Sequence, residues 1–336
     1  MTGVDAAKRS HPLRGLATRF GAGDLALRYY HQPLGTVREF LLAGGPLETR
    51  RTEHGRQAMI DAAWTLPPLT RPSGEATLEI SFLSGAKYWY QTLFCFYSLQ
   101  TNSHAPIIPT IYDDGSFDDD TIAAIARVAP WAKFVRSDEI EASVADGLPA
   151  RRFPTLRALR VAYPHLRKLC DVHLGRQGWT TVLDSDMLFF RPPTTLLDWL
   201  VAPDRPCHLI DKERAYGYSR ELMAELSGFA EPERVNVGVC GLLSETIDWV
   251  RLEYWCRTML EREGPSYLQE QALSAMLLAG QDCLRLSEAD YKVLPSVQEG
   301  RNPSAVLHHY VAQSKRSYFQ DGWRRVLGAA GGPRPG

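Results

Sequence analysis

The sequence contains no long apolar segment. No run of apolar residues approaches the roughly 20 residues that a membrane-spanning helix needs. The first 20 residues, MTGVDAAKRSHPLRGLATRF, also contain no apolar core of the kind found in secretory signals. We therefore expect a protein of the reducing cytoplasm.

Paired cysteines are also missing. The six cysteines lie far apart, and no two of them form a C-x-x-C pair. Most stand in apolar stretches, where cysteine behaves as a small core residue. We therefore expect neither a disulfide framework nor a zinc site built from paired cysteines.

The chain has no excess of charge of either sign. It carries 38 lysines and arginines against 39 acidic residues, a net charge of −1. The basic residues are scattered, so no basic surface is expected to attract nucleic acid. Its 336 residues, 44% hydrophobic and 23% charged, are typical of a soluble globular enzyme with one large domain or two smaller ones.

Strand-like and helix-like segments alternate through most of the chain. Strands are expected at 76–84, 105–114, 131–137, 180–183, 207–212, 234–243, 283–288 and 305–311. Helices are expected at 87–100, 118–129, 164–178, 246–263 and 267–279. This alternation predicts an α/β fold, with a Rossmann-type mixed, mostly parallel sheet flanked by helices.

A proline-rich stretch at 65–75 separates this α/β region from a helical beginning of the chain, because proline cannot continue a helix. We predict an N-terminal helical extension (1–65), an α/β domain (76–326) and a disordered tail (327–336).

Two acidic residues follow a buried strand in the stretch TTVLDSDMLFFRPP. Asp184 and Asp186 are two residues apart, so their side chains leave the strand on the same side. Ligands of such sheets bind at the carboxyl ends of strands. Two carboxylates aimed at one point need a cation between them, and oxygen ligands favour Mg²⁺ or Mn²⁺ shared with substrate phosphates. The alternative is that one aspartate caps a turn while the other is solvated.

Three later segments carry polar residues in unusual places. They are a strand with Asn236 and Gly238, an apolar helix with Glu270 and Gln271, and a strand ending in His308 and His309 with Lys315 beyond it. Taken singly, each has a structural explanation: a sheet bulge, a solvated helix face and a packed or surface histidine.

Taken in this order, the four segments resemble the GT-A nucleotide-sugar glycosyltransferases, most closely the family 8 type that includes glycogenin. That family shows a strand ending in D-x-D, an N-x-G strand, an acidic-Gln pair and an H-aromatic-x-G-x-x-K segment. The resemblance covers roughly residues 76–320. Ala312 stands where the family usually has glycine, and Glu270 replaces its commoner Asp.

The resemblance implies a GT-A fold and a divalent metal, Mn²⁺ or Mg²⁺, held by Asp184, Asp186 and His309. His309 is chosen over His308 because neighbouring strand residues point to opposite faces, and its spacing to Lys315 fits the family motif. The donor would be bound by Tyr88, Asp113, Lys168, Asp184 and Lys315.

The implied reaction moves a sugar from a nucleotide-sugar, a UDP-sugar by resemblance, to a hydroxyl of an unknown saccharide, lipid-linked or protein acceptor. Asn236, Glu270 and Gln271 would face the sugar and the acceptor. Family 8 enzymes retain the anomeric configuration, so retention is expected. In an inverting enzyme, Glu270 would instead deprotonate the acceptor.

Two other classes share part of this pattern. A phosphohydrolase of the haloacid dehalogenase type also has D-x-D after a strand, but it has Thr or Val where this chain has Leu188. A non-catalytic binding protein on the glycosyltransferase scaffold is the second alternative, and the intact set of Asp, His and Lys residues argues against it.

No motif explains residues 1–65, in which arginines alternate with apolar residues. The segment either covers one flank of the sheet or lies on an anionic membrane surface, where a glycosyltransferase would meet a lipid-linked acceptor.

Overall fold

The computed structural model describes residues 45–73 and 77–330. Contacts divide the chain into two units, 1–49 and 50–336, and the architecture below is that of the second. Of the predicted N-terminal extension, the structure describes helix α4 (Gly45–Ala63), while residues 1–44 lie outside the described part. The predicted domain boundaries remain predictions.

The core of the fold is a seven-stranded sheet with the order β3-β2-β1-β4-β7-β6-β8. Neighbouring strands are parallel, except that β7 runs antiparallel to both β4 and β6. The predicted mixed, mostly parallel sheet is therefore confirmed. Its strands are β1 (Leu78–Ser84), β2 (Ile107–Asp113), β3 (Lys133–Val135), β4 (Trp179–Leu183), β6 (Cys207–Ile210), β7 (Val235–Leu243) and β8 (Leu284–Leu286).

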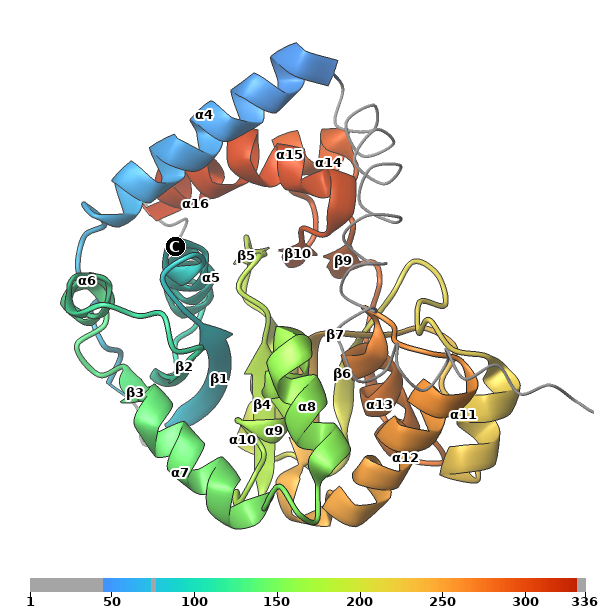
Figure 1. Ribbon diagram of the computed structural model, residues 1–336. Coiled ribbons are helices and arrows are strands. Elements are labelled where there is room, and N and C mark those ends of the chain that lie inside the picture. The colour runs from blue at the N-terminus through green and yellow to red at the C-terminus, as the bar shows by residue number, and fades with distance from the viewer. Residues whose placement is uncertain (1–44, 74–76, 331–336) are drawn as a thin grey trace, which may run out of the picture. The chain divides into compact units, whose positions relative to one another are not determined.

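A second, three-stranded sheet follows the carboxyl end of β4 (Figure 1). Its order is β5-β10-β9, formed by Met187–Phe189, Leu307–His309 and Tyr291–Val293. β10 pairs antiparallel with β5, and His309 stands opposite Met187. Because Met187 directly follows Asp186, this pairing brings His309 to the end of the D-x-D turn.

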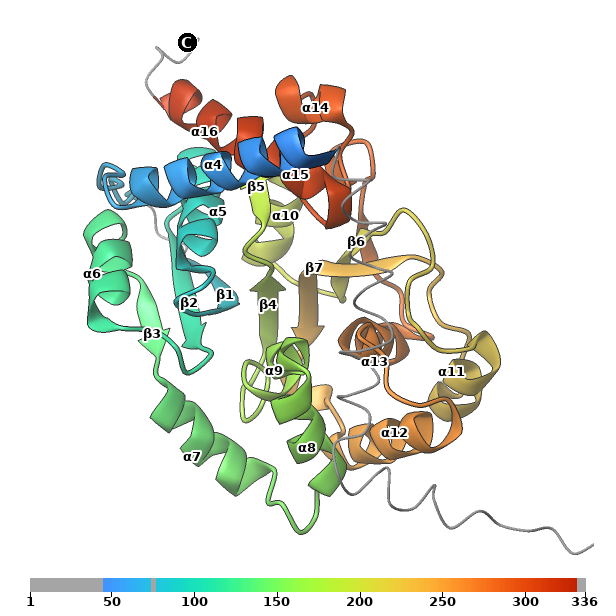
Figure 2. The same cartoon turned by 45° about the horizontal axis from the view of Figure 1, so that its top comes forward.

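Helices cover both faces of the large sheet (Figures 1 and 2). Leu183 of β4 packs into a core with α4, α5, α6, α10 and α16, while its neighbour Val182 packs into a second core with α7, α8, α9, α11, α12 and α13. The bounds of these helices are α5 (Trp89–Thr101), α6 (Asp119–Val128), α7 (Ser137–Gly147), α8 (Pro154–Ala162), α9 (Arg167–Cys170), α10 (Thr194–Val201), α11 (Arg220–Ser227), α12 (Trp249–Arg262), α13 (Gln269–Leu278) and α16 (Trp323–Ala330).

Shorter helical turns connect the remaining segments near the C-terminus. They are α14 (Val297–Arg301), a 3₁₀ turn (Ala312–Ser314), α15 (Lys315–Ser317) and a π-helical turn (Tyr318–Gly322). The helix α16 runs into the segment predicted as a tail, of which residues 331–336 lie outside the described part.

The helix predicted at 164–178 is wrong in its length. A 3₁₀ turn (Pro164–Leu166) leads into the short helix α9, and turns follow up to β4. Gly175 and Gly178 adopt φ angles of 70° and 76°, which a right-handed helix does not contain. These glycines form the bend that redirects the chain into β4.

Candidate functional site

The D-x-D turn is held by backbone hydrogen bonds on both sides. The amide of Asp184 donates to the carbonyl of Gly238 in β7 over 2.8 Å, and the carbonyl of Asp186 accepts from the amide of Tyr310 over 2.9 Å. Between them, the hydroxyls of Ser185 and Thr92 lie 2.7 Å apart. The turn therefore joins the two sheets in a fixed position.

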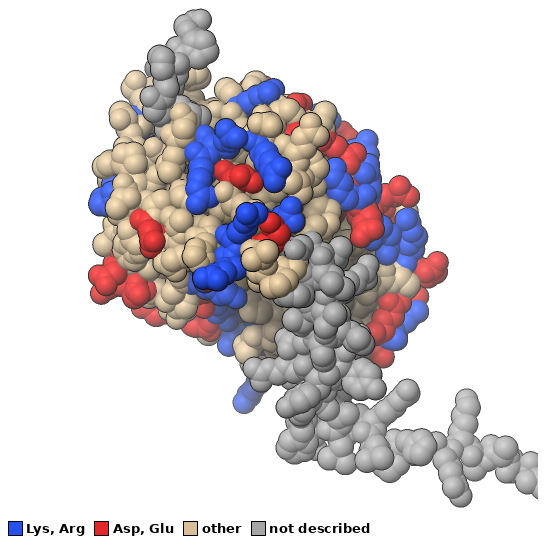
Figure 3. Space-filling model, turned by 90° about the horizontal axis from the view of Figure 1, so that it is seen from above, with Lys and Arg blue, Asp and Glu red and all other residues tan. Residues whose placement is uncertain are grey.

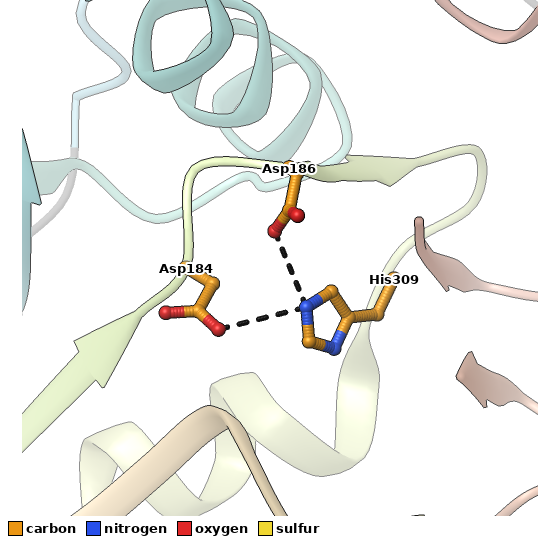
Figure 4. A group of neighbouring side chains, drawn as sticks. All are labelled: Asp184, Asp186 and His309. Carbon is orange, nitrogen blue, oxygen red and sulfur yellow. Dashed lines mark ion pairs between the residues drawn. The ribbon is translucent and has the colours of Figure 1, made fainter. Parts of the chain in front are cut away.

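Asp184, Asp186 and His309 converge in this position (Figure 4). The Nε2 atom of His309 lies 3.2 Å from Asp186 Oδ1 and 3.5 Å from Asp184 Oδ2. One ligand atom from each residue falls within 4.8 Å of the others. His309 is buried and the two carboxylates are half-buried. Two carboxylates and one imidazole fit a divalent cation such as Mn²⁺.

The other ring nitrogen of His309 contacts the N-x-G segment. Asn236 Oδ1 lies 2.9 Å from His309 Nδ1 and accepts from the amide of Gly238 over 3.0 Å. A side chain at Gly238 would collide with the imidazole ring. Glycine at this place therefore allows β7 to approach the histidine closely. Gly238 also lies where the register between β6 and β7 shifts, so the bulge expected as the alternative is present as well.

Each aspartate of the D-x-D turn pairs with a lysine. Lys315 Nζ lies 2.7 Å from Asp186 Oδ2, and Lys168 Nζ lies 2.9 Å from Asp184 Oδ1. Burial alone would raise the pKa of Asp186, but the charge of Lys315 outweighs it and holds that pKa well below its ordinary value. Likewise, burial opposes the charge of Lys315, yet Asp186 raises its pKa. Both groups are therefore charged at neutral pH.

Glu270 and Gln271 begin helix α13, and both side chains are buried, which is not the environment of a solvated helix face. Glu270 Oε2 lies 3.2 Å from Lys168 Nζ. Burial raises the pKa of Glu270 to about 7, although the charge of Lys168 opposes the rise. Gln271 Nε2 donates to the carbonyl of Ala215 over 2.8 Å and to Asp211 Oδ2 over 3.2 Å. Its amide oxygen therefore remains available as an acceptor.

Two predicted donor-binding residues have different surroundings. Tyr88 is 39% exposed at the start of α5, and the ammonium of Lys87 lies 5.0 Å from its ring centre. Asp113 is buried, and its Oδ1 accepts from the amides of Gly115 and Phe117. Its described hydrogen bonds thus shape the loop after β2 and do not join Asp113 to the three converging residues.

Asp211, which directly follows β6, was not predicted as a site residue. Its Oδ2 accepts from Asn236 Nδ2 over 3.0 Å as well as from Gln271. The missed signal was an acidic residue at the end of an apolar strand, in CHLIDK, the same signal that identified the D-x-D turn. His165 and Tyr267 form an exposed edge-to-face ring pair that was also not predicted. His165 stands two positions before α9, which supplies Lys168, and Tyr267 stands two positions before α13, which supplies Glu270.

The sequence matches no family model and no curated protein. The crystal structure of the galactosyltransferase LgtC with donor and acceptor sugar analogues is similar, with 17% identity and a TM-score of 0.50 over 77% of this chain and 97% of that chain. An active-site mutant of LgtC gives 15% identity and a TM-score of 0.50 over 76% and 98%.

Apo mouse xyloside xylosyltransferase 1 matches with 10% identity and a TM-score of 0.43, over 70% of this chain and 97% of that chain. The likeness to the two LgtC structures shows the fold alone. The chain has the GT-A fold of these glycosyltransferases, as the sequence predicted.

Proposed function

We propose that the protein is a metal-dependent glycosyltransferase that moves a sugar from a nucleotide-sugar to a hydroxyl acceptor. The observation that carries this proposal is the convergence of Asp184, Asp186 and His309 in a chain with the GT-A fold. Departure of a nucleoside diphosphate from a sugar leaves negative charge on the phosphate, and a bound Mn²⁺ or Mg²⁺ would neutralise it.

The lysines of the site have separate roles in this proposal. Lys315 lies beside Asp186 and would supply a second positive charge to the diphosphate. Lys168 contacts both Asp184 and Glu270, and so holds two acidic residues of different elements in place. Tyr88 would stack on the nucleobase, and Asp113 would contact the nucleoside.

Retention of the anomeric configuration is the stereochemistry that we propose. An inverting enzyme would need a base for the acceptor hydroxyl, and Glu270 is the acidic residue at the corresponding helix. Here the pairing with Lys168 opposes that use, although burial raises the pKa of Glu270 to about 7. Asn236 and Gln271 would instead contact the donor sugar.

The donor that we propose is a UDP-sugar, and the acceptor is a saccharide or a lipid-linked or protein-bound hydroxyl. The similar LgtC structure holds donor and acceptor sugar analogues, which supports a sugar at both places. Thermal shift of the purified protein against nucleotide-sugars, with and without Mn²⁺, tests the proposal because ligands of the folded state raise its stability. We expect UDP compounds with Mn²⁺ to give the largest shift; no shift with any nucleotide-sugar would contradict the proposal.

We also propose that the enzyme acts in the cytoplasm and that residues 1–65 contact an anionic membrane or cover the domain. In the described ranges, no helix is both long and apolar enough to span a bilayer. Residues 1–44 lie outside those ranges. Sedimentation of the full-length protein with anionic vesicles at low salt separates the two roles, and a protein that never sediments has no membrane role.

A further inference from the structure

A chain of hydrogen bonds runs behind the three converging residues. Asp211 Oδ2 accepts from Asn236 Nδ2 over 3.0 Å, and Asn236 Oδ1 faces His309 Nδ1 over 2.9 Å. These three residues come from three different strands or strand ends, β6, β7 and β10. The chain therefore links an acidic residue that no motif predicted to the proposed metal ligand.

The donor and acceptor of each hydrogen bond in this series follow from two groups whose roles are fixed, the backbone amide of Gly238 and the carboxylate of Asp211. The amide of Gly238 can only donate a hydrogen, and the carboxylate of Asp211 can only accept one. The side chain of Asn236 must therefore turn its oxygen toward Gly238 and its nitrogen toward Asp211. The same oxygen then accepts a hydrogen from Nδ1 of His309.

This direction decides which ring nitrogen of His309 has a lone pair for a metal. When Nδ1 holds its hydrogen, a neutral histidine has a lone pair on Nε2. That nitrogen faces the carboxylates of Asp184 and Asp186. In the opposite tautomer, Nε2–H would donate to Asp186, and the ring would be unable to bind a metal.

We propose that Asp211 is a positioning residue of the metal centre, which acts through Asn236 to hold His309 in its metal-binding tautomer. The proposal rests on the function proposed above, because it takes Asp184, Asp186 and His309 as metal ligands. It also gives the N-x-G segment a further role: Asn236 orients the histidine, and Gly238 makes room for its ring.

The carboxylate of Asp211 is itself held on both oxygens. Oδ1 accepts from the amide of Lys212 over 2.7 Å, and Oδ2 accepts from Gln271 as well as from Asn236. An asparagine at 211 can satisfy only one side of this arrangement. If the side-chain oxygen of this asparagine faces the side-chain amides of Asn236 and Gln271, its nitrogen meets the backbone amide of Lys212, which is also a donor. If the side chain is turned over, its nitrogen meets the donor groups of Asn236 and Gln271 instead.

The expected effect of Asp211→Asn is a Mn²⁺ affinity lower by about 10- to 100-fold, the usual effect of losing a group that orients a metal ligand. The exchange variant Asp211→Asn with Asn236→Asp should recover most of that affinity. In this pair, residue 211 donates to residue 236, whose carboxylate again accepts from Gly238 and His309, and only the contact of residue 211 with Gln271 stays unmade. A merely structural role for Asp211 would leave the tautomer of His309 unchanged in Asp211→Asn.

The experiment measures Mn²⁺ binding by electron paramagnetic resonance on the full-length wild type, Asp211→Asn and the exchange variant. Glu253→Gln is the control, because this buried acid accepts from the amides of Thr155 and Leu156 in α8, away from the metal ligands. ¹⁵N spectra of labelled histidine, at a pH where the ring is neutral and with His309→Gln for assignment, report the tautomer without any metal.

The proposal predicts the Nδ1–H tautomer for His309 in the wild type. It also predicts that Asp211→Asn binds Mn²⁺ more weakly, that the exchange variant recovers most of the affinity, and that Glu253→Gln binds Mn²⁺ like the wild type. An Nε2–H tautomer in the wild type overturns it, even if the variants do not fold. Wild-type affinity in Asp211→Asn, or an exchange variant without rescue, also overturns it. A wild type that binds no Mn²⁺ contradicts the proposed function instead, and the ¹⁵N spectra then still decide the tautomer.

Discussion

At the scale of single residues, Ala312 shows how a departure from a family motif becomes a strained position. Its φ angle is 45°, in the left-handed region, at the position where family 8 usually has glycine. A residue with a β-carbon pays about 1–2 kcal/mol there. Glycine, which has no β-carbon, would adopt this angle without that cost.

Ala312→Gly is expected to raise the free energy of unfolding by about 0.5–1 kcal/mol, because the lost strain exceeds the added flexibility of the unfolded chain. Urea denaturation measures this change. Ala123→Gly on the exposed side of α6 is the matched control, and it should lower stability by a similar amount. A loss of stability in Ala312→Gly would contradict the strain.

His173 makes stability depend on pH. Its ring is buried, with Nδ1 2.9 Å from the hydroxyl of Ser244, and burial together with Arg176 lowers its pKa to about 3. Below its ordinary value of 6.5, the unfolded chain therefore binds a proton that the folded chain does not. The stabilisation is complete above pH 6.5 and is lost as the pH falls toward 3.

In this range His173 should contribute about 1.4 kcal/mol of lost stability per pH unit. Urea denaturation of the wild type and of His173→Gln, at several pH values between 7 and 4, checks the contribution. The variant should lose stability less steeply. Equal slopes in the two proteins would show that His173 is not held neutral.

The adjacent histidines of β10 have different partners. His309 faces Asp184 and Asp186, whereas His308 Nε2 lies 2.9 Å from Glu299 Oε1 and its Nδ1 lies 2.9 Å from the Tyr310 hydroxyl. We predict that His309→Ala weakens Mn²⁺ binding. His308→Ala should instead destabilise the protein by about 1–3 kcal/mol, because buried partners lose their hydrogen bonds. Calorimetric Mn²⁺ titration giving the reverse order would refute the assignment.

At the scale of elements, the sequence predicts the strands of the large sheet and the two aspartates because both signals are local. Alternating or continuous apolar residues identify each of these strands, and Asp184 and Asp186 stand at the end of one. The strands β5 and β9 were missed because each pairs with β10, and a local pattern does not show a pairing between segments that are not neighbours in the sequence. The role of Asp211 was missed because its partners, Asn236 and Gln271, meet it only in the folded chain.

Helix α4 packs against the C-terminal turns from residue 50 onward. A side chain at Gly55 would collide with the carbonyl of Phe319, and Gln320 Nε2 donates to Thr52 Oγ1 over 3.0 Å. We predict that Gly55→Val lowers the melting temperature, although valine forms helices better than glycine. His54→Val, on the exposed side of the same helix, should leave it nearly unchanged. Equal melting temperatures for both variants would show that this contact is not tight.

At the scale of the whole molecule, acidic and basic residues are nearly equal in number. The acidic residues of the D-x-D turn are paired with lysines inside the fold. On the face shown in Figure 3, Lys and Arg side chains lie around Asp and Glu side chains and do not form an unbroken basic surface. The junction of the two sheets follows the same rule, since each aspartate of the D-x-D turn has its own lysine. The proposed reaction depends on this junction, where β4, β7 and β10 meet.

The most direct test of the account is the Mn²⁺-dependent turnover of the UDP-sugar that gives the largest thermal shift, compared between the wild type, Asp186→Ala and Asp184→Ala. We predict that Asp186→Ala lowers turnover by at least about a hundredfold, since the cation that would neutralise the diphosphate loses a ligand. Asp184→Ala should cost less, and Glu253→Gln should turn over donor like the wild type. Full Mn²⁺-dependent activity of Asp186→Ala would contradict the metal centre and, with it, the proposed function.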